Sequence, residues 1–470
     1  MDQMLAELAA AVGGPQVLTG ADMAKYASDW MGHYHGSPLA VVRPGTTAEV
    51  AACMQIAARA GVNLVPIGGN TGLVGGTMAT ASLIISLDRM NRIRELRPGA
   101  RLVIAEAGVI LQKIHEAAEA EGLYFPLWFG ARGSAMLGGA LSTNAGGSNV
   151  LRYGSTRGLC LGLEVVLADG RILNLMSELH KDNSGYDLKQ LFIGAEGTLG
   201  IITAAVMKLV PAPRAHATAV VAADSLPKAL GLLNRMQEAT GGRVEAFELM
   251  PEDYSHRLSK VRPDLGQPFA TIPPVTLLIE AATTSADEAN PGPDGQVPLV
   301  AKLETVLGTM LEEGLIDDAV IAQSEAQRMA IWARREAAAE ICHGIHPFVD
   351  TDICLPIDRV DTFLTGIGAR LAAIDPAATT ITVGHLGDGN LHFSVYPTRE
   401  GLEDPVMNCV EDMVAELGGS FSAEHGIGLS KLPSMRRRKD PVALDVMRAV
   451  KAALDPEGRM NPGKVIPARG

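Results

Sequence analysis

The sequence predicts an α+β protein of two domains. Its 470 residues exceed the size of a typical single domain, and 47% hydrophobic with 20% charged residues is the composition of an ordinary globular protein. Residues 41–210 read as short alternations of helix and strand. After a proline-rich segment, strands come in pairs separated by helices, which is typical of an antiparallel sheet covered by helices.

The first domain is expected over residues 1–212. It opens with a helix over residues 2–12, and PGTTAEVAACMQIAARAG (residues 44–61) predicts a turn, a threonine cap and an amphipathic helix. NLVPIGG and SLIISL predict buried strands, the first of which runs into a glycine turn, and LEVVLADGRIL predicts a hairpin with an Asp-Gly turn.

The second domain is expected over residues 213–455, and a C-terminal segment, residues 456–470, is expected to return to the first domain. The proline-rich VPAPRAH marks the boundary between the domains. AVVAAD, VEAFELM and VTLLIEAA predict strands, and helices are expected near residues 226–238 and 325–342. A strand over residues 350–355 and the hairpin TITVGHLGDGNLHFSVY complete an antiparallel α+β domain.

Composition and charge argue against several classes of protein. The net charge of −13 argues against nonspecific nucleic-acid binding by the whole surface. There is no apolar run long enough for a membrane span, and the acidic N-terminus MDQMLAELAAAVGG differs from a basic secretory signal. Five widely spaced cysteines, none in a C-x-x-C pair, argue against a disulfide framework, an iron–sulfur centre and a cysteine zinc site. We therefore expect a reducing, cytoplasmic compartment.

Three glycine clusters lie in the first domain, over residues 66–76, 130–147 and 194–203. The first, PIGGNTGLVGG, has no helix-forming segment after it and matches neither G-x-G-x-x-G nor G-x-x-x-x-G-K-[ST], which argues against a Rossmann site or a P-loop. Successive glycines can instead point several backbone N–H groups into one concavity that binds a diphosphate. Tight turns would explain a single glycine pair, whereas three clusters between short strands favour dinucleotide binding.

The hairpin GHLGDGNLH of the second domain carries two histidines. If it closes at residues 387–389, His385 and His392 can lie across from each other. Along the second strand Leu391, Phe393 and Val395 share one face, which leaves His392 and Ser394 on the other.

A second polar segment, SAEHGIG, contains Glu424 and His425. Two imidazoles, from His385 and His392, and the carboxylate of Glu424 form a ligand set that suits Zn²⁺ or a similar divalent ion. His425 is a candidate base near neutral pH. An ordinary hydrogen bond in a sheet would explain one such histidine, but four such groups in two glycine-flanked segments favour a site.

The predicted helix that contains IWARRE adds two cations, Arg334 and Arg335. A planar guanidinium suits bidentate binding of a carboxylate. An arginine on a solvated helix face explains Arg334 well, and for Arg335 the residues alone leave that explanation and a binding role evenly matched.

Four motifs, PIGGNTGLVGG, STNAGG, RYG and GAEGTLGIIT, resemble those of the FAD-binding domain of the vanillyl-alcohol oxidase / para-cresol methylhydroxylase flavoprotein superfamily. Within it, residues 20–466 resemble the D-2-hydroxyglutarate and D-lactate dehydrogenases. The resemblance implies a two-domain flavoprotein with a para-cresol-methylhydroxylase-type FAD-binding domain and an antiparallel-sheet substrate domain of the FAD-linked oxidase C-terminal type. The FAD contacts it implies are Gly68, Gly69, Asn70, Thr71, Gly72, Ser134, Gly139, Thr143, Asn144, Gly147, Glu196, Gly197, Ile202 and Asn461. Asn70 stands where some members attach flavin through a histidine, so noncovalent FAD is expected.

The resemblance also implies a chemistry, the oxidation of a D-2-hydroxy acid to the 2-oxo acid. His385, His392 and Glu424 would hold the metal, with Zn²⁺ the expected ion, His425 would be the general base, and Arg335 would pair with the substrate carboxylate. Without iron–sulfur cysteines, the chain would pass electrons to a separate acceptor, an electron-transfer flavoprotein or a quinone, between which the sequence does not choose. A homodimer is a further expectation.

Three positions of the substrate wall depart from the D-2-hydroxyglutarate dehydrogenases. A threonine and a lysine that help to hold the substrate there are Ala339 and Asp350 here, and an asparagine two residues after the second histidine is Ser394. We expect Asp350 and Ser394, with Arg335 and His425, to line the substrate site, and Asp350 to disfavour a second carboxylate. Lys431 or His346 is the alternative that would bind such a carboxylate.

Three other functions are weighed against this one. An oxidase that uses O2 is the nearest alternative. A catalytically silent flavin-binding subunit would have no use for the complete set of His385, His392, Glu424 and His425. The nonredox alkyl-glycerone-phosphate synthase branch fits poorly, since the hydroxy-acid pattern is complete.

Overall fold

The computed structural model describes residues 1–469, which fall into two compact units. Unit 1 comprises residues 1–147, residues 154–211 and the chain from Glu424 onward. Unit 2 comprises residues 148–153 and 212–423. The boundary after Pro211 lies one residue from the expected end of the first domain at residue 212.

Two boundaries differ from the expected ones. The return to unit 1 begins at Glu424 and not at residue 456, because the backbone just beyond it bonds to unit 1, as in the N–H of Leu429, which donates to the carbonyl of Val74 at 2.7 Å. Residues 148–153 belong to unit 2 although the chain on both sides of them belongs to unit 1.

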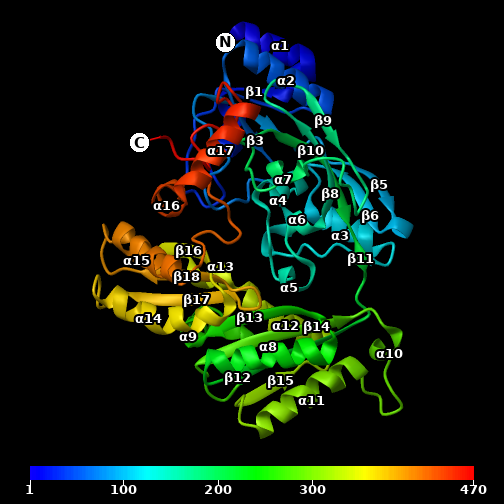
Figure 1. Ribbon diagram of the computed structural model, residues 1–470, viewed down its shortest axis with the longest axis vertical. Helices are drawn as coiled ribbons and strands as arrows, with labels where there is room; N and C mark the ends of the chain where they lie inside the picture. The colour runs from blue at the N-terminus through cyan, green and yellow to red at the C-terminus, as the bar shows by residue number, and fades with distance from the viewer. Residues whose placement is uncertain (470) are drawn as a thin grey trace. The chain divides into compact units, whose positions relative to one another are not determined.

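Unit 1 contains a four-stranded sheet in the order β1-β2-β4-β3, of which β1 and β3 are labelled in Figure 1. β2 (Ala40–Val42), β4 (Ser82–Ser86) and β3 (Asn63–Ile67) are parallel, and β1 (Val17–Leu18) is antiparallel to β2. Between β2 and β3 lies α2 (Thr47–Arg59), where the side chain of the N-cap Thr46 accepts a hydrogen bond from the N–H of Glu49 at 3.1 Å, as the sequence predicts. β3 runs directly into the first glycine cluster.

The second sheet of unit 1 is antiparallel, in the order β5-β6-β10-β8-β9, and β7 and β11 form a separate pair. The expected hairpin is β8–β9, with Val166 opposite Ile172 and Gly170 of the turn at φ 83°. The strands are β5 (Ile93–Arg97), β6 (Leu102–Glu106), β7 (Leu123–Tyr124), β8 (Cys160–Val166), β9 (Ile172–Leu175), β10 (Ile201–Lys208) and β11 (Val210–Pro211).

The helices of unit 1 are mostly short. They are α1 (Asp2–Val12), α2, α3 (Leu111–Glu119), α4 (Leu137–Thr143), α6 (Thr156–Leu159), α7 (Lys189–Phe192), α16 (Leu432–Arg438) and α17 (Pro441–Leu454). Across residues 1–469, no helix is long and apolar enough to cross a membrane.

Unit 2 is built on one seven-stranded sheet in the order β15-β12-β14-β13-β17-β18-β16. Every neighbouring pair is antiparallel, which confirms the expected antiparallel domain. The strands are β12 (Ala215–Ala223), β13 (Val244–Pro251), β14 (Val275–Thr283), β15 (Asp318–Ile321), β16 (Val349–Cys354), β17 (Thr379–His385) and β18 (Asn390–Tyr396).

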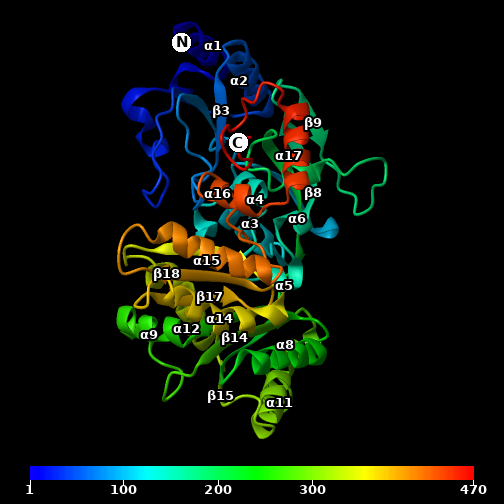
Figure 2. The same cartoon turned by 60° about the vertical axis from the view of Figure 1, so that its left-hand side comes forward.

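Helices cover both faces of this sheet. One apolar layer joins it to α8 (Leu226–Thr240), α11 (Pro298–Glu312), α14 (Val360–Ala372) and α15 (Glu403–Glu416), and α14 lies between α8 and α15 (Figure 2). The other layer joins it to α9 (Glu252–Val261), α12 (Glu325–Glu336) and α13 (Ala338–Cys342). The short helices α5 (Val150–Tyr153) and α10 (Ala286–Ala289) complete unit 2. α12 and α13 replace the single helix expected over residues 325–342.

The register of the β17–β18 hairpin differs from the expected one. Val383, not His385, lies directly opposite His392, and His385 pairs with Asn390. The turn takes up residues 386–389, and the pairing is displaced by two residues from the expected His385–His392 pair. A shift of two keeps both histidines on one face. The prediction that Leu391, Phe393 and Val395 point to the other face is confirmed, since all three belong to the core under α8, α11, α14 and α15.

Candidate active site

The first glycine cluster forms a close-packed loop at the end of β3. A Cβ on Gly69 would lie 2.2 Å from the carbonyl oxygen of Ser134, so only glycine allows this approach. Asn70 has φ 54°, and its amide donates to the carbonyl of Ser28 at 2.9 Å and accepts from the hydroxyl of Thr77 at 2.7 Å. Within residues 1–469, the N–H groups of residues 69–72 donate to no protein acceptor. Adjacent free N–H groups suit a diphosphate, so this loop fits the expected FAD.

Other expected FAD residues of unit 1 have structural contacts of their own. Asn144 ends α4 at φ 52°, and its side-chain oxygen accepts from the hydroxyl of Ser155 and the N–H of Arg157. The amide of Asn461 donates to the carbonyls of Gly76 and Glu196, whereas its buried side-chain oxygen has no partner among the described residues. That unpaired oxygen is an acceptor available to a ligand.

The carboxylate of Glu196 holds the segment that follows His425. It accepts hydrogen bonds from the N–H groups of Ile427 at 2.7 Å and Gly428 at 2.9 Å. Burial raises the pKa of Glu196, although these two bonds oppose the shift. The N–H of Gly147 donates to the carboxylate of Glu424 at 3.0 Å. Unit 1 therefore fixes the chain on both sides of His425.

The two hairpin histidines lie close together in unit 2. The ring centroids of His385 and His392 are 5.7 Å apart, with an interplanar angle of 80°. Nδ1 of His385 lies 2.9 Å and 2.8 Å from the two carboxylate oxygens of Glu248. Because a carboxylate only accepts hydrogen bonds, Nδ1 carries a hydrogen, and Nε2 is the ring nitrogen that can serve as a metal ligand.

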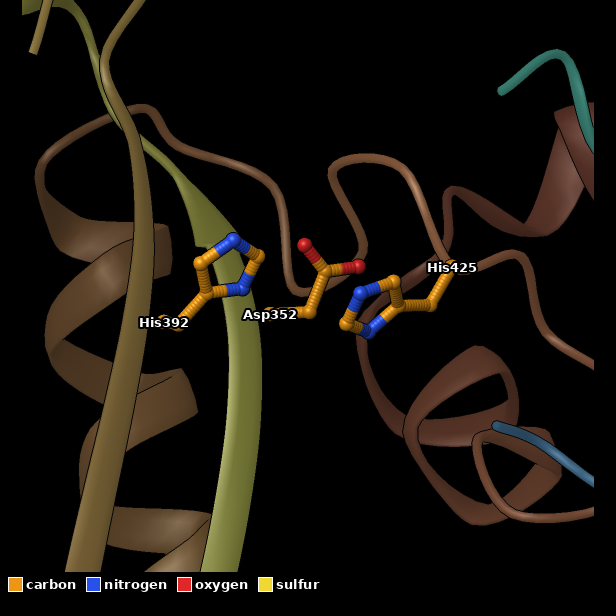
Figure 3. A group of neighbouring side chains, drawn as sticks. All are labelled: Asp352, His392 and His425. Atoms are coloured by element: carbon orange, nitrogen blue, oxygen red, sulfur yellow. The ribbon is translucent and has the colours of Figure 1, made fainter. Parts of the chain in front are cut away.

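Asp352 is a further carboxylate beside His392. It lies on β16 directly opposite His392 on β18, so the two side chains share one face of the sheet (Figure 3). Its oxygens accept from the amide of Asn390 at 3.1 Å and from the N–H of Ala423 at 3.2 Å. Glu424 and His425 are the next two residues of the chain after Ala423.

The structure separates the roles of the two neighbouring arginines of α12. The guanidinium of Arg334 donates to the carbonyls of Leu265 and Gly266 and to the side chain of Gln267, so it holds a loop. Arg335 donates through Nε to Glu248 at 2.7 Å. Its two terminal nitrogens donate to no acceptor among residues 1–469. They are the pair that a substrate carboxylate can engage.

Glu248 is buried between two positively polarised partners, with 1% of its side chain exposed. Burial favours the neutral acid, but His385 and Arg335 hold the pKa of Glu248 below its ordinary value. Glu280, on the neighbouring β14, accepts both arms of Arg328 at 2.7 Å and Nε1 of Trp332 at 2.9 Å. α12 is thus held on the sheet by two buried carboxylates.

Two residues of the expected substrate wall, Ser394 and Asp350, contact each other. The hydroxyl of Ser394 donates to the carboxylate of Asp350 at 3.1 Å, across the β16–β18 pair. Asp350 is exposed, and Ala339 lies on α13. Burial, with the charge of Asp350 second, raises the pKa of the nearby Cys342 thiol to about 12.

His216, Glu245 and Glu280 form another group whose ligand atoms lie within 4.8 Å of one another in unit 2. Arg328 already pairs with Glu280, and Arg152 donates to Glu245 at 2.8 Å. These cations would repel a metal ion, so this group is explained by ion pairing.

The sequence reasoning missed Glu248, Glu280 and Asp352. A carboxylate inside an otherwise apolar strand, as in VEAFELM and VTLLIEAA, was the available signal, because buried charges need partners.

Comparison with known proteins decides the family. Residues 212–465 match the family described as FAD linked oxidases, C-terminal domain, and residues 38–176 match the FAD binding domain family. The chain belongs to the FAD-linked oxidase family. Membership confirms the predicted FAD-binding domain followed by an FAD-linked oxidase C-terminal domain.

Curated relatives of this FAD-linked oxidase are named D-2-hydroxyglutarate dehydrogenases. It is 38% identical over 444 residues to the mitochondrial protein of Bos taurus, which covers 93% of this chain and 79% of the relative. It is 35% identical over 479 residues to the protein of Stutzerimonas stutzeri (strain A1501), which covers 99% of each chain. These relatives confirm the predicted enzyme class, an FAD-dependent dehydrogenase.

Among solved structures, p-cresol methylhydroxylase with substrate bound has a TM-score of 0.74 and 14% identity, covering 98% of this chain and 96% of that chain. At this identity the likeness shows the fold alone.

Proposed function

We propose that this FAD-dependent dehydrogenase oxidises a D-2-hydroxy acid to the 2-oxo acid. The observation that carries the proposal is the row formed by Arg335, Glu248, His385 and His392 on one face of the unit 2 sheet. It combines a guanidinium with two free donors and a histidine pair suited to a metal. Relatives named for a D-2-hydroxy acid support the same chemistry.

The proposed metal ligands are His385, His392 and Glu424, with Zn²⁺ as the ion. Two nitrogens and one carboxylate oxygen are a common set for a catalytic zinc with open positions. Support also comes from chain connectivity, because Ala423 bonds to Asp352 opposite His392 and Glu424 is the next residue.

In this proposal Arg335 binds the C1 carboxylate through its terminal nitrogens, and His425 takes the proton of the 2-hydroxyl. When bound, FAD supplies an acceptor for the C2 hydride, and a divalent metal supplies a Lewis acid that favours ionisation of the hydroxyl. The electron acceptor, the homodimer and the cytoplasmic location remain predictions.

Anaerobic flavin reduction tests this function. The purified holoenzyme is mixed with D-lactate, D-malate and D-2-hydroxyglutarate and with their L-enantiomers, and flavin absorbance is followed. We expect bleaching by at least one D-acid and none by the L-acids. Bleaching by no D-acid would contradict the proposal, and fast reoxidation of reduced enzyme by O2 would favour the oxidase alternative.

We predict that FAD is held without a covalent bond. The side chain of Asn70 is engaged by Ser28 and Thr77, and an amide is not the nucleophile that flavin attachment needs. The holoprotein should be yellow, and acid precipitation should release the flavin into the supernatant. Flavin that stays with the pellet would overturn this prediction.

We predict that Asp350 disfavours a substrate with a second carboxylate. Two like charges a few ångströms apart repel by about 1 kcal/mol when well solvated, and Asp350 is exposed. Asp350→Lys should raise kcat/KM for D-2-hydroxyglutarate relative to D-lactate several-fold, whereas the exposed Asp358→Lys, with the same change in net charge, should not.

The substrate preference of the parent enzyme can contradict this prediction. If its kcat/KM for D-2-hydroxyglutarate exceeds that for D-lactate by tenfold or more, which is about 1.4 kcal/mol, the predicted repulsion by Asp350 is contradicted. The names of the relatives are then the better guide to the substrate.

A further inference from the structure

The buried carboxylate of Glu248 contacts both Arg335 and His385. The proposed function assigns Arg335 to the C1 carboxylate of the substrate and His385 to the metal near its 2-hydroxyl. One of its oxygens accepts from Nε of Arg335 at 2.7 Å, and Nδ1 of His385 lies within 2.9 Å of both oxygens. Glu248 comes from β13, Arg335 from α12 and His385 from the end of β17, so three elements meet at one side chain.

We propose that Glu248 is a positioning residue that sets Arg335 and His385 relative to each other. The inference rests on the proposed function, in which Arg335 binds the C1 carboxylate and His385 is a metal ligand near the 2-hydroxyl. These two substrate groups are attached to adjacent carbon atoms. A single rigid carboxylate between their two protein partners therefore fixes the spacing that the substrate has to match.

The contact determines which atoms each partner presents to the proposed site. With Nε engaged by Glu248, Arg335 offers the end of the guanidinium that carries its two terminal nitrogens. With Nδ1 engaged, His385 offers Nε2, and a carboxylate on the other ring nitrogen makes an imidazole a stronger ligand. Both effects require the negative charge of Glu248 as well as its shape.

The alternative is that Glu248 serves only as the counter-ion of a buried arginine. Glu280 provides the matched control, because it is also buried and also holds α12, through Arg328 and Trp332. Its hydrogen-bond partners within residues 1–469 are Thr218, Arg328 and Trp332, and His385 is not among them. If the role of Glu248 is only to hold α12, Glu248→Gln and Glu280→Gln should behave alike.

The test compares Glu248→Gln and Glu280→Gln by two measurements on the purified holoenzyme. Zn²⁺ affinity is measured by competition with a chromophoric chelator, and KM and kcat are measured with the best D-2-hydroxy acid. Glu248→Gln should weaken Zn²⁺ binding by roughly 10–100-fold and raise KM, and Glu280→Gln should leave Zn²⁺ affinity within about threefold of the parent. Equal Zn²⁺ affinity in the parent and Glu248→Gln, or an equal loss in both variants, would overturn the inference.

A second variant and a measurement on the parent enzyme distinguish the remaining outcomes. If Glu248→Gln does not fold, Glu248→Asp retains the charge that balances Arg335 but withdraws the carboxylate by one methylene, and it should still weaken Zn²⁺ binding. If the parent itself binds no Zn²⁺ but is active, the proposed metal site fails, which is a different outcome from a parent that binds Zn²⁺ as tightly as its Glu248 variants.

Discussion

His425→Ala is expected to lower the rate of flavin reduction by about 10²-fold or more, the usual contribution of a general base. The change removes the ring alone, because residues on both sides of His425 have hydrogen bonds of their own. The N–H of Gly147 bonds to Glu424, and Glu196 accepts from the N–H of Ile427. The rate is measured by anaerobic stopped-flow, and metal content by elemental analysis. Flavin and metal should both stay bound.

Controls separate this effect from loss of the metal. His256 is exposed on α9, and His256→Ala should reduce flavin at the parent rate. Removal of the metal with a chelator should abolish turnover and leave FAD bound, and His392→Ala should have the same effect. The reason is that the expected FAD residues belong to unit 1 and His392 to unit 2. Flavin reduction at the parent rate in His425→Ala would remove His425 from the chemistry.

Arg335→Ala is expected to lower kcat/KM by an amount that corresponds to about 2–5 kcal/mol of transition-state free energy, the cost of leaving a buried partner charge unpaired. The terminal nitrogens of Arg335 donate to no other acceptor within the described chain, so their loss weakens substrate binding. Loss of Nε also removes a hydrogen-bond partner of the buried Glu248. Arg335→Lys should also be poor, since an ammonium cannot reproduce the two parallel bonds of a guanidinium. Steady-state kinetics with the best D-2-hydroxy acid measure the effect.

Arg334 is the matched control for this prediction. Its guanidinium bonds to the loop at Leu265–Gln267, so Arg334→Ala should lower thermal stability with little change in kcat/KM. Unchanged kcat/KM in Arg335→Ala together with a large loss in Arg334→Ala would move the carboxylate site to Arg334.

Local patterns predicted the parts of the fold that depend on neighbours in the sequence. The threonine cap at Thr46, the β8–β9 hairpin and the two faces of β18 follow from turn chemistry and from the period-two alternation of a strand. The register of β17–β18 could not be predicted from these patterns, because a four-residue turn and a shorter turn are both compatible with the same glycines.

Long-range contacts explain what the sequence did not reveal. Glu248 bonds to Arg335 and His385, which follow it by 87 and 137 residues. Asp352 was placed in a strand, but its position opposite His392 depends on the register of β16. The glycine clusters were recognised because a ligand-binding loop leaves its signal in consecutive residues.

The division of the chain into units has a consequence for its synthesis. The edge of β3, which carries the first glycine loop, is covered by residues near the C-terminus: the N–H of Leu64 donates to the carbonyl of Arg459, and the N–H of Asn461 donates to the carbonyl of Leu64. Unit 2 has all its parts once residue 423 has been made, whereas unit 1 needs residues on both sides of unit 2. We therefore expect unit 2 to complete its contacts before unit 1 does during synthesis, in contrast to the usual N-to-C order of domain folding.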